Sequence, residues 1–203
     1  KGGSKIIGTA TTVEEAQFIE EGGADLVVAT GNAAGGHRAA FLDLNATSFL
    51  ETRDLLPKVL EKVQLPVIAA GGLTTSHDIK NMFALGAAGV QLGTVFLATK
   101  ESGANKDHKE RLFAKTGYET TLTKVFTGRY GRVIKSPFVA DNADAKVAPY
   151  PLQSSFLAPL RKKYMEKGET DLMAYWAGQP TETLRYKSAS ELFVSVVNEL
   201  HRS

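Results

Sequence analysis

One histidine stands out among the residues that could do chemistry, because two glycines precede it at the end of an expected strand. The chain has four histidines, and three of them fall in or beside polar helical stretches, where a surface role is expected. His37 instead follows Gly35 and Gly36 in a loop of small residues. An imidazole takes or gives a proton near neutral pH. This position therefore predicts a general base or acid, with a solvated loop histidine as the alternative.

Two further stretches end in glycine in the same way. An apolar run over residues 66–70 stops at Gly71-Gly72, and a second run over residues 89–92 stops at Gly93-Thr94. A helical pattern separates the two runs and reaches Leu85, with Gly86 behind it. Two parallel strands joined in this way end at the same edge of a sheet. His37 is expected at that edge too.

Glycines at two neighbouring strand ends favour a phosphate ligand. A residue without Cβ lets an anion approach the main-chain N–H groups closely, and barrel proteins often bind phosphate at their last two strands. Tight turns without a ligand are the alternative. No Walker-type lysine or G-x-G-x-x-G fingerprint follows the strands, which argues against a triphosphate or a dinucleotide. No pair of histidines has metal-ligand spacing, so no metal site is predicted.

The elements that must position these residues form a repeat of strand and helix. Strands are expected over 5–10, 25–29, 66–70 and 89–92, and helices over 12–21, 50–63 and 75–85. Thr12 and Glu15 have the spacing of a capping box, and Gly22-Gly23 would end that helix. In the second helix, regular structure is expected from Leu55, with Pro57 in the first turn. Four βα units in succession predict an α/β fold with a parallel sheet.

The repeat ends after Thr94. A polar helix is expected over residues 101–115, an extended arm with turns over 124–139, and amphipathic helices over 156–167 and 188–202. We therefore expect two parts: residues 1–100 with the four βα units, and residues 101–203 as an extension with helices and an extended arm that packs on them.

Composition excludes several classes of function. The chain has 203 residues, 43% of them hydrophobic and 23% charged, which is ordinary for a globular protein. A net charge of +2 gives no reason to expect nucleic acid or a membrane as partner. The absence of cysteine excludes disulfides and thiolate chemistry. Together with the lack of a visible signal peptide before the first strand, this favours a cytoplasmic protein.

Several blocks of sequence, in order and spacing, resemble the C-terminal half of the barrel of nitronate monooxygenases, formerly called 2-nitropropane dioxygenases. They are TTVEEA, GADLVVATG, AGGHRA, PVIAAGG and LGAAGVQLGTVFLATKES, followed by FTGRYGR and WAGQ. The resemblance implies a (β/α)8 TIM-barrel type of fold with FMN as cofactor. It also implies oxidation of alkyl nitronates with O2 to a carbonyl compound and nitrite.

The resemblance assigns roles to particular positions. His37 corresponds to the family's catalytic histidine. The flavin phosphate would be held by main chain at two strand ends, and the loop before the histidine would border the flavin. These cofactor-binding positions are Gly31, Gly35, Gly36, Ala70, Gly71, Gly72, Gln91, Leu92, Gly93 and Thr94.

The chain also departs from the family pattern. Ala33 stands where many members have Glu, and Thr9 where some have a flavin-contacting Lys. The family's first four βα units have no counterpart in these residues, so we expect that half of the barrel in another part of the same chain or in another chain. Two alternatives stay open: a flavin-dependent enoyl-acyl-carrier-protein reductase that uses a nicotinamide donor, and a non-catalytic FMN- or phosphate-binding module.

Overall fold

A parallel sheet occupies the first half of the computed structural model, which describes residues 2–44, 47, 49–114 and 116–201. Its strands are β1 (Ile7–Ala10), β2 (Leu26–Thr30), β4 (Val67–Ala70) and β5 (Gly89–Gln91). They lie in the order β1-β2-β4-β5, and every neighbouring pair is parallel. The predicted α/β fold with a parallel sheet is thus confirmed, and within the described residues β1 and β5 form its two edges.

Three helices connect these strands: α1 (Val13–Glu21), α2 (Thr52–Leu60) and α3 (Ser76–Ala84). Their apolar sides share one core cluster with alternate residues of the strands. The fully buried members of this cluster are Ala10, Ala16, Val27, Ala29, Leu55, Leu56, Val59 and Ala69. On the opposite face of the sheet, Thr9 and Gln91 are exposed. One face of the sheet is therefore packed against helices, while the other carries the side chains that can meet a ligand.

One expected capping box and one expected helix start differ from the structure. Only half of the expected capping box forms at α1: the Thr12 hydroxyl accepts from the Glu15 N–H, but the Glu15 carboxylate binds Thr11 instead of the Thr12 N–H. The second helix begins at Thr52, three residues before the expected Leu55. The buried Thr52 hydroxyl explains this start, because it donates to the carbonyl oxygens at the end of β4 and so fixes the first turn.

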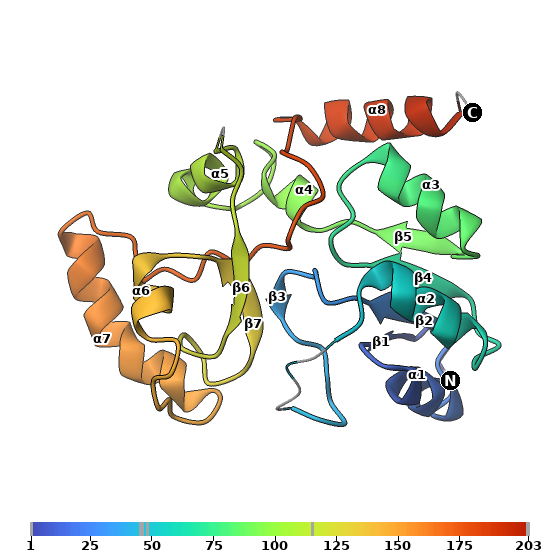
Figure 1. The fold of residues 1–203 in the computed structure, drawn as a ribbon, viewed down its shortest axis with the longest axis horizontal. Helices are drawn as coiled ribbons and strands as arrows, with labels where there is room; N and C mark the ends of the chain where they lie inside the picture. The colour runs from blue at the N-terminus through green and yellow to red at the C-terminus, as the bar shows by residue number, and fades with distance from the viewer. Residues whose placement is uncertain (1, 45–46, 48, 115, 202–203) are drawn as a thin grey trace.

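A second, antiparallel sheet contains the histidine predicted from the sequence. It consists of β3 (Gly36–His37), β7 (Gly131–Ile134) and β6 (Thr120–Thr123), in the order β3-β7-β6. The loop of small residues expected around His37 is thus partly a strand, and the arm expected over 124–139 contains β7, one strand of a hairpin. Figure 1 shows β3 beside β7, between the hairpin and the parallel sheet.

The remaining helices are α4 (Thr94–Leu97), α5 (Lys106–Leu112), α6 (Pro137–Asp141), α7 (Leu152–Glu166) and α8 (Ala189–His201). In Figure 1, α5, α6 and α7 lie near the second sheet, whereas α8 lies along α3 of the parallel half. The helix expected over 156–167 begins four residues earlier, and it buries none of its residues. It still packs on the second half of the molecule, because Leu157 lies partly buried against the core cluster that contains Val125 and Phe126. None of the helices described is long and apolar enough to cross a membrane.

Candidate active site

A cleft of about 460 Å³ opens where the strands of the parallel sheet end. It reaches from β1 and β5 to the short strand β3 and to the segment 176–180 of the extension. Nine of the eleven residues predicted from the sequence line it: Gly35, Gly36, His37, Ala70, Gly71, Gly72, Gln91, Gly93 and Thr94. The structure thus brings the predicted histidine and both glycine ends into one cavity.

Gly31 and Leu92 lie outside the lining of this cleft. A Cβ atom at Gly31 would come within 2.3 Å of the Thr52 main-chain nitrogen. Gly31 therefore lets α2 approach the end of β2, which is a packing role rather than a ligand contact. No lining role for Leu92 is visible either.

The glycines at the two strand ends differ in the space around them. Gly71 and Gly72 have positive φ angles of 102° and 76°, which favour glycine. A Cβ atom at Gly72 would come within 2.6 Å of the Ala33 Cβ. At Gly93, by contrast, nothing lies within 4 Å of the added Cβ position. Gly93 therefore leaves the most room for a ligand to approach the main chain. Gly71 and Gly72 are required by the backbone conformation of their turn as well.

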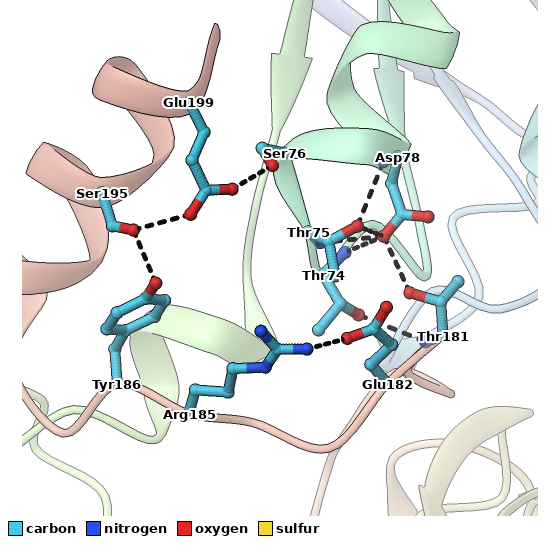
Figure 2. Close-up of polar contacts among 10 residues, drawn as sticks. All are labelled: Thr74, Thr75, Ser76, Asp78, Thr181, Glu182, Arg185, Tyr186, Ser195 and Glu199. Atoms are coloured by element: carbon cyan, nitrogen blue, oxygen red, sulfur yellow. Dashed lines mark hydrogen bonds and ion pairs between the residues drawn. The ribbon is translucent and has the colours of Figure 1, made fainter. Parts of the chain in front are cut away.

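Some main-chain N–H groups near this turn bind a protein side chain, and others have no protein partner. Asp78 in α3 accepts from the N–H groups of Thr74 and Thr75 at 2.9 and 2.8 Å, and from the Thr181 hydroxyl at 2.7 Å (Figure 2). The start of α3 is thus occupied by a carboxylate. Among the described residues, no partner exists for the N–H groups of Gly72 and Gly93. These groups fit an anion such as a phosphate.

His37 contacts three side chains of the extension. Its Nε2 lies 2.8 Å from the Thr127 Oγ1. The Trp176 ring packs against the imidazole with 4.7 Å between ring centroids, and Tyr150 meets it edge-on at 5.7 Å. Since Tyr150, Thr127 and Trp176 all follow residue 100, the ring is placed by the extension rather than by the βα repeat.

The register of the antiparallel sheet explains how Trp176 reaches the histidine. His37 pairs with Gly131 of β7. A Cβ atom at Gly131 would come within 2.4 Å of the Trp176 Cζ3. The missing side chain at residue 131 therefore leaves room for the indole ring beside the imidazole. Trp176 is also held by Val133, with which it forms an isolated antiparallel bridge.

The surroundings keep His37 neutral to lower pH than a free histidine. Desolvation in the cleft lowers its pKa below the usual 6.5, and the nearby Arg129 guanidinium lowers the pKa further. The Arg129 side chain is fixed in place, since its Nη2 donates to the carbonyl oxygens of Arg38 and Ala40 at 2.8 and 3.0 Å. A neutral imidazole is the form that can accept a proton.

Two buried arginines hold the loop before the histidine. Arg38 and Arg132 both bind Asn32, which in turn donates to Glu51. Arg132 also joins the loop to β6 through the Thr120 hydroxyl at 3.0 Å. Burial and the neighbouring Arg132 lower the pKa of Arg38 to about 10, against the opposing effect of Glu51. Arg38 thus closes the loop on itself through Gly31 and Asn32, while Arg132 ties the loop to the hairpin.

The segment 176–179 closes the cleft from the extension side. Gly178 donates its N–H to the Thr94 Oγ1 at 2.9 Å, and Gln179 donates its N–H to the Ala33 carbonyl at 2.9 Å. The Gln179 side chain accepts from the N–H and hydroxyl of Thr120, both at 2.9 Å. The sequence predicted no role for this segment. The WAGQ block in this segment resembles the family, but the block alone did not indicate which residues it contacts.

Within the described residues, no cluster of three or more histidine, aspartate or glutamate side chains could hold a metal ion.

Comparison with known proteins supports the resemblance found in the sequence. The family model for nitronate monooxygenase matches residues 1–199. A probable nitronate monooxygenase from Staphylococcus saprophyticus is 37% identical over 199 residues, covering 96% of this chain and 56% of that protein. One from Bacillus subtilis is 39% identical over 184 residues, covering 90% and 53%.

Solved structures agree in fold. A nitroalkane oxidase from Streptomyces ansochromogenes superposes with a TM-score of 0.90 at 38% identity, covering 98% of this chain and 58% of that one. FabK from Thermotoga maritima gives a TM-score of 0.76 at 27% identity, covering 98% and 62%. This second likeness is weaker in both measures.

The chain spans a little over half the length of the relatives it matches. The coverage by itself does not support a separate half-barrel partner. The match of the family model over nearly the whole chain nevertheless decides the relationship: this chain belongs to the nitronate monooxygenase family.

Proposed function

We propose that the protein binds FMN in this cleft and oxidises alkyl nitronates or nitroalkanes with O2, giving a carbonyl compound and nitrite. One observation carries the proposal: a histidine with a lowered pKa lines the same cavity as two strand ends whose main-chain N–H groups have no partner among the described residues. Family membership and the likeness to a nitroalkane oxidase support it. A cytoplasmic location remains a prediction.

The phosphate of FMN would be held by main chain at Gly72 and Gly93. Nothing lies within 4 Å of the position that a Cβ would take at Gly93, so the neighbouring N–H groups are accessible to a phosphate oxygen. Gly35 and Gly36 of the β3 loop, together with Gln91, would border the rest of the cofactor. When bound, FMN supplies the two-electron redox chemistry that no side chain of this site can perform.

His37 has two possible tasks toward the substrate. For a neutral nitroalkane, it would remove the proton from the carbon next to the nitro group, because the imidazole is uncharged at neutral pH. For a nitronate already formed, it would hydrogen-bond the nitronate oxygens. The Trp176 ring packs against the imidazole and limits its rotation.

The test compares both substrates in the intact protein. The purified protein should be yellow and release FMN on heating. His37→Asn should keep the flavin and lose about 10²- to 10⁴-fold in turnover of a neutral nitroalkane, the usual contribution of a general base, with a much smaller loss on the preformed nitronate. His77→Asn, on the exposed surface of α3, is the matched control.

Several results would count against this function. Equal losses on both substrates would make His37 an orienting group only. Unchanged rates in His37→Asn would mean that His37 is a solvated loop histidine without a catalytic role. Rapid NADH oxidation coupled to enoyl reduction would favour the reductase alternative. Release of FAD instead of FMN would contradict the proposed cofactor. Flavin binding without turnover of either substrate would contradict the proposed reaction.

A further inference from the structure

The hydroxyl group of Thr127 has three polar neighbours in the hairpin. Its Oγ1 lies 2.8 Å from the His37 Nε2, 3.2 Å from the Arg129 carbonyl oxygen and 3.4 Å from the Arg129 main-chain nitrogen. A hydroxyl has one proton to donate and two lone pairs to accept with. The Arg129 carbonyl can only accept and the Arg129 N–H can only donate. These two contacts therefore decide whether the imidazole donates to the hydroxyl or accepts from it.

Only one assignment satisfies all three contacts. If the Thr127 proton goes to the Arg129 carbonyl, the two lone pairs take the Arg129 N–H and an N–H of the imidazole. If the Thr127 proton goes to the imidazole instead, two acceptor oxygens face each other at 3.2 Å with no proton between them. The second arrangement leaves the carbonyl without this donor and is less favourable.

We infer that Thr127 holds neutral His37 as the tautomer that is protonated on Nε2, which leaves the lone pair on Nδ1. Among the described residues, no hydrogen bond to the His37 Nδ1 is present, so this nitrogen is available to a substrate. Thr127 is then a positioning residue for the reaction. The other groups around the ring are the Trp176 and Tyr150 side chains and the Arg129 cation.

This inference rests on the proposed function for its chemical consequence. In deprotonation of a nitroalkane, the C–H bond next to the nitro group breaks and a new N–H bond forms at Nδ1. The electron pair of the C–H bond moves into the nitro group and gives the nitronate. His37 becomes an imidazolium whose Nε2–H still donates to Thr127, so the ring does not have to rotate during the proton transfer.

Nitrogen NMR of the intact protein, labelled with 15N-histidine, measures the tautomer directly. The His37 signals are identified by their loss in His37→Asn. At a pH where the imidazole is neutral, the wild-type protein should show a protonated Nε2 and an unprotonated Nδ1. Thr127→Val, which cannot accept a hydrogen bond, should give a mixture of both tautomers. Thr127→Ser should restore the wild-type pattern, and Thr121→Val on the neighbouring strand β6 should leave it unchanged.

Kinetics provide a second readout. Thr127→Val should lower kcat for a neutral nitroalkane about tenfold, the equivalent of about 1.4 kcal/mol in the activation barrier, with little change for a preformed nitronate. Thr127→Ser should recover most of the lost rate. The thermal unfolding midpoint of each variant shows whether the hairpin still folds.

Two results overturn the inference. One is a protonated Nδ1 on neutral His37 in the wild-type protein. The other is a Thr127→Val protein that keeps both the wild-type tautomer and the wild-type rates. The NMR result is independent of turnover. An active His37→Asn variant would contradict the proposed function, whereas a protonated Nδ1 would contradict the tautomer assignment. The two failures can therefore be told apart.

Discussion

The two sheets of this molecule are built in different ways and carry different parts of the candidate site. In the parallel sheet, each strand is joined to the next through a helix, although the connection between β2 and α2 also contains β3, and one core cluster supports all four strands. In the antiparallel sheet, β3 pairs with a hairpin that follows about 90 residues later. The contact between His37 and Thr127 spans 90 residues, and that between Asn32 and Arg132 spans 100.

In the proposed function, the parallel sheet would hold the cofactor and the antiparallel sheet would orient the base. The glycine ends of β4 and β5 belong to the local repeat, so the candidate phosphate site depends on the parallel sheet. The orientation and the pKa of His37 depend on residues of the extension, chiefly Thr127, Arg129 and Trp176. A variant can therefore disturb one sheet while the properties of the other sheet can still be measured.

The largest effect is expected in the core of the parallel sheet. Leu56 in α2 is completely buried in the cluster that supports the strands. Leu56→Ala should lower the free energy of unfolding by about 2–5 kcal/mol, because it removes buried apolar contacts and leaves a cavity. Denaturant unfolding of the intact protein measures this. Leu160→Ala on α7, where no residue is buried, is the control and should cost far less. Equal losses would mean that the parallel sheet is not the stabilising unit.

A second variant tests the candidate phosphate site without disturbing the fold. Gly93→Val places a side chain where nothing lies within 4 Å, so the unfolding free energy should change little. The side chain should keep a phosphate from the nearby N–H groups. Loss of one or two charge-assisted hydrogen bonds costs about 1.5–3 kcal/mol each in FMN affinity, which fluorescence titration of flavin measures. Gly103→Val, which also has free space, is the control. Unchanged affinity would place the phosphate elsewhere.

A pair of strand glycines compares the two sheets directly. Gly131→Ala in β7 brings a Cβ within 2.4 Å of the Trp176 ring, whereas Gly89→Ala in β5 meets Ile68 only at 3.7 Å. Gly131→Ala should therefore cost about 1–3 kcal/mol in stability, as overpacking usually does, and should displace Trp176 from His37. Tryptophan fluorescence reports the displacement, because Trp176 is the one tryptophan in the chain. A similar cost for both variants would contradict the packing argument.

The smallest expected effect is a shift in pH dependence. Protonated His37 cannot accept a proton, so turnover of a neutral nitroalkane should fall as the pH drops through the pKa of His37. Desolvation and the Arg129 cation hold this pKa below 6.5. Arg129→Met should raise it and move the acid limb of the profile to higher pH, while Arg129→Lys keeps the charge and should move it less. An unmoved limb in Arg129→Met would show that another group controls the profile.

The sequence predicted the parallel half well because its signals are local. Apolar runs, the capping residue Thr12, and the glycines after β4 and β5 lie within or beside the elements they define. Where the prediction was wrong, at the start of α2, the deciding contact joins Thr52 to carbonyl oxygens 18 and 19 residues away. A helix start fixed by such a contact cannot be read from its neighbours alone.

The surroundings of His37 could not be predicted for the same reason. The strand β6 reads TTLT, which has little apolar patterning, and its pairing with β7 becomes evident only in the structure. Thr127, Tyr150 and Trp176 lie far from His37 in the sequence, and nothing about their types marks them as partners of a histidine. The sequence located the candidate base but not the groups that orient it.

The long separation between β3 and its hairpin has a consequence for how the protein forms. Contacts between neighbouring elements close quickly, whereas pairings across many residues require costly loop closure and form slowly. During synthesis, the βα units can begin to pack before residues 120–179 leave the ribosome. The polypeptide should thus acquire its phosphate-facing edge first. His37 gains its Thr127 and Trp176 neighbours only after this later segment folds back, so the proposed proton-transfer site should be completed late in maturation.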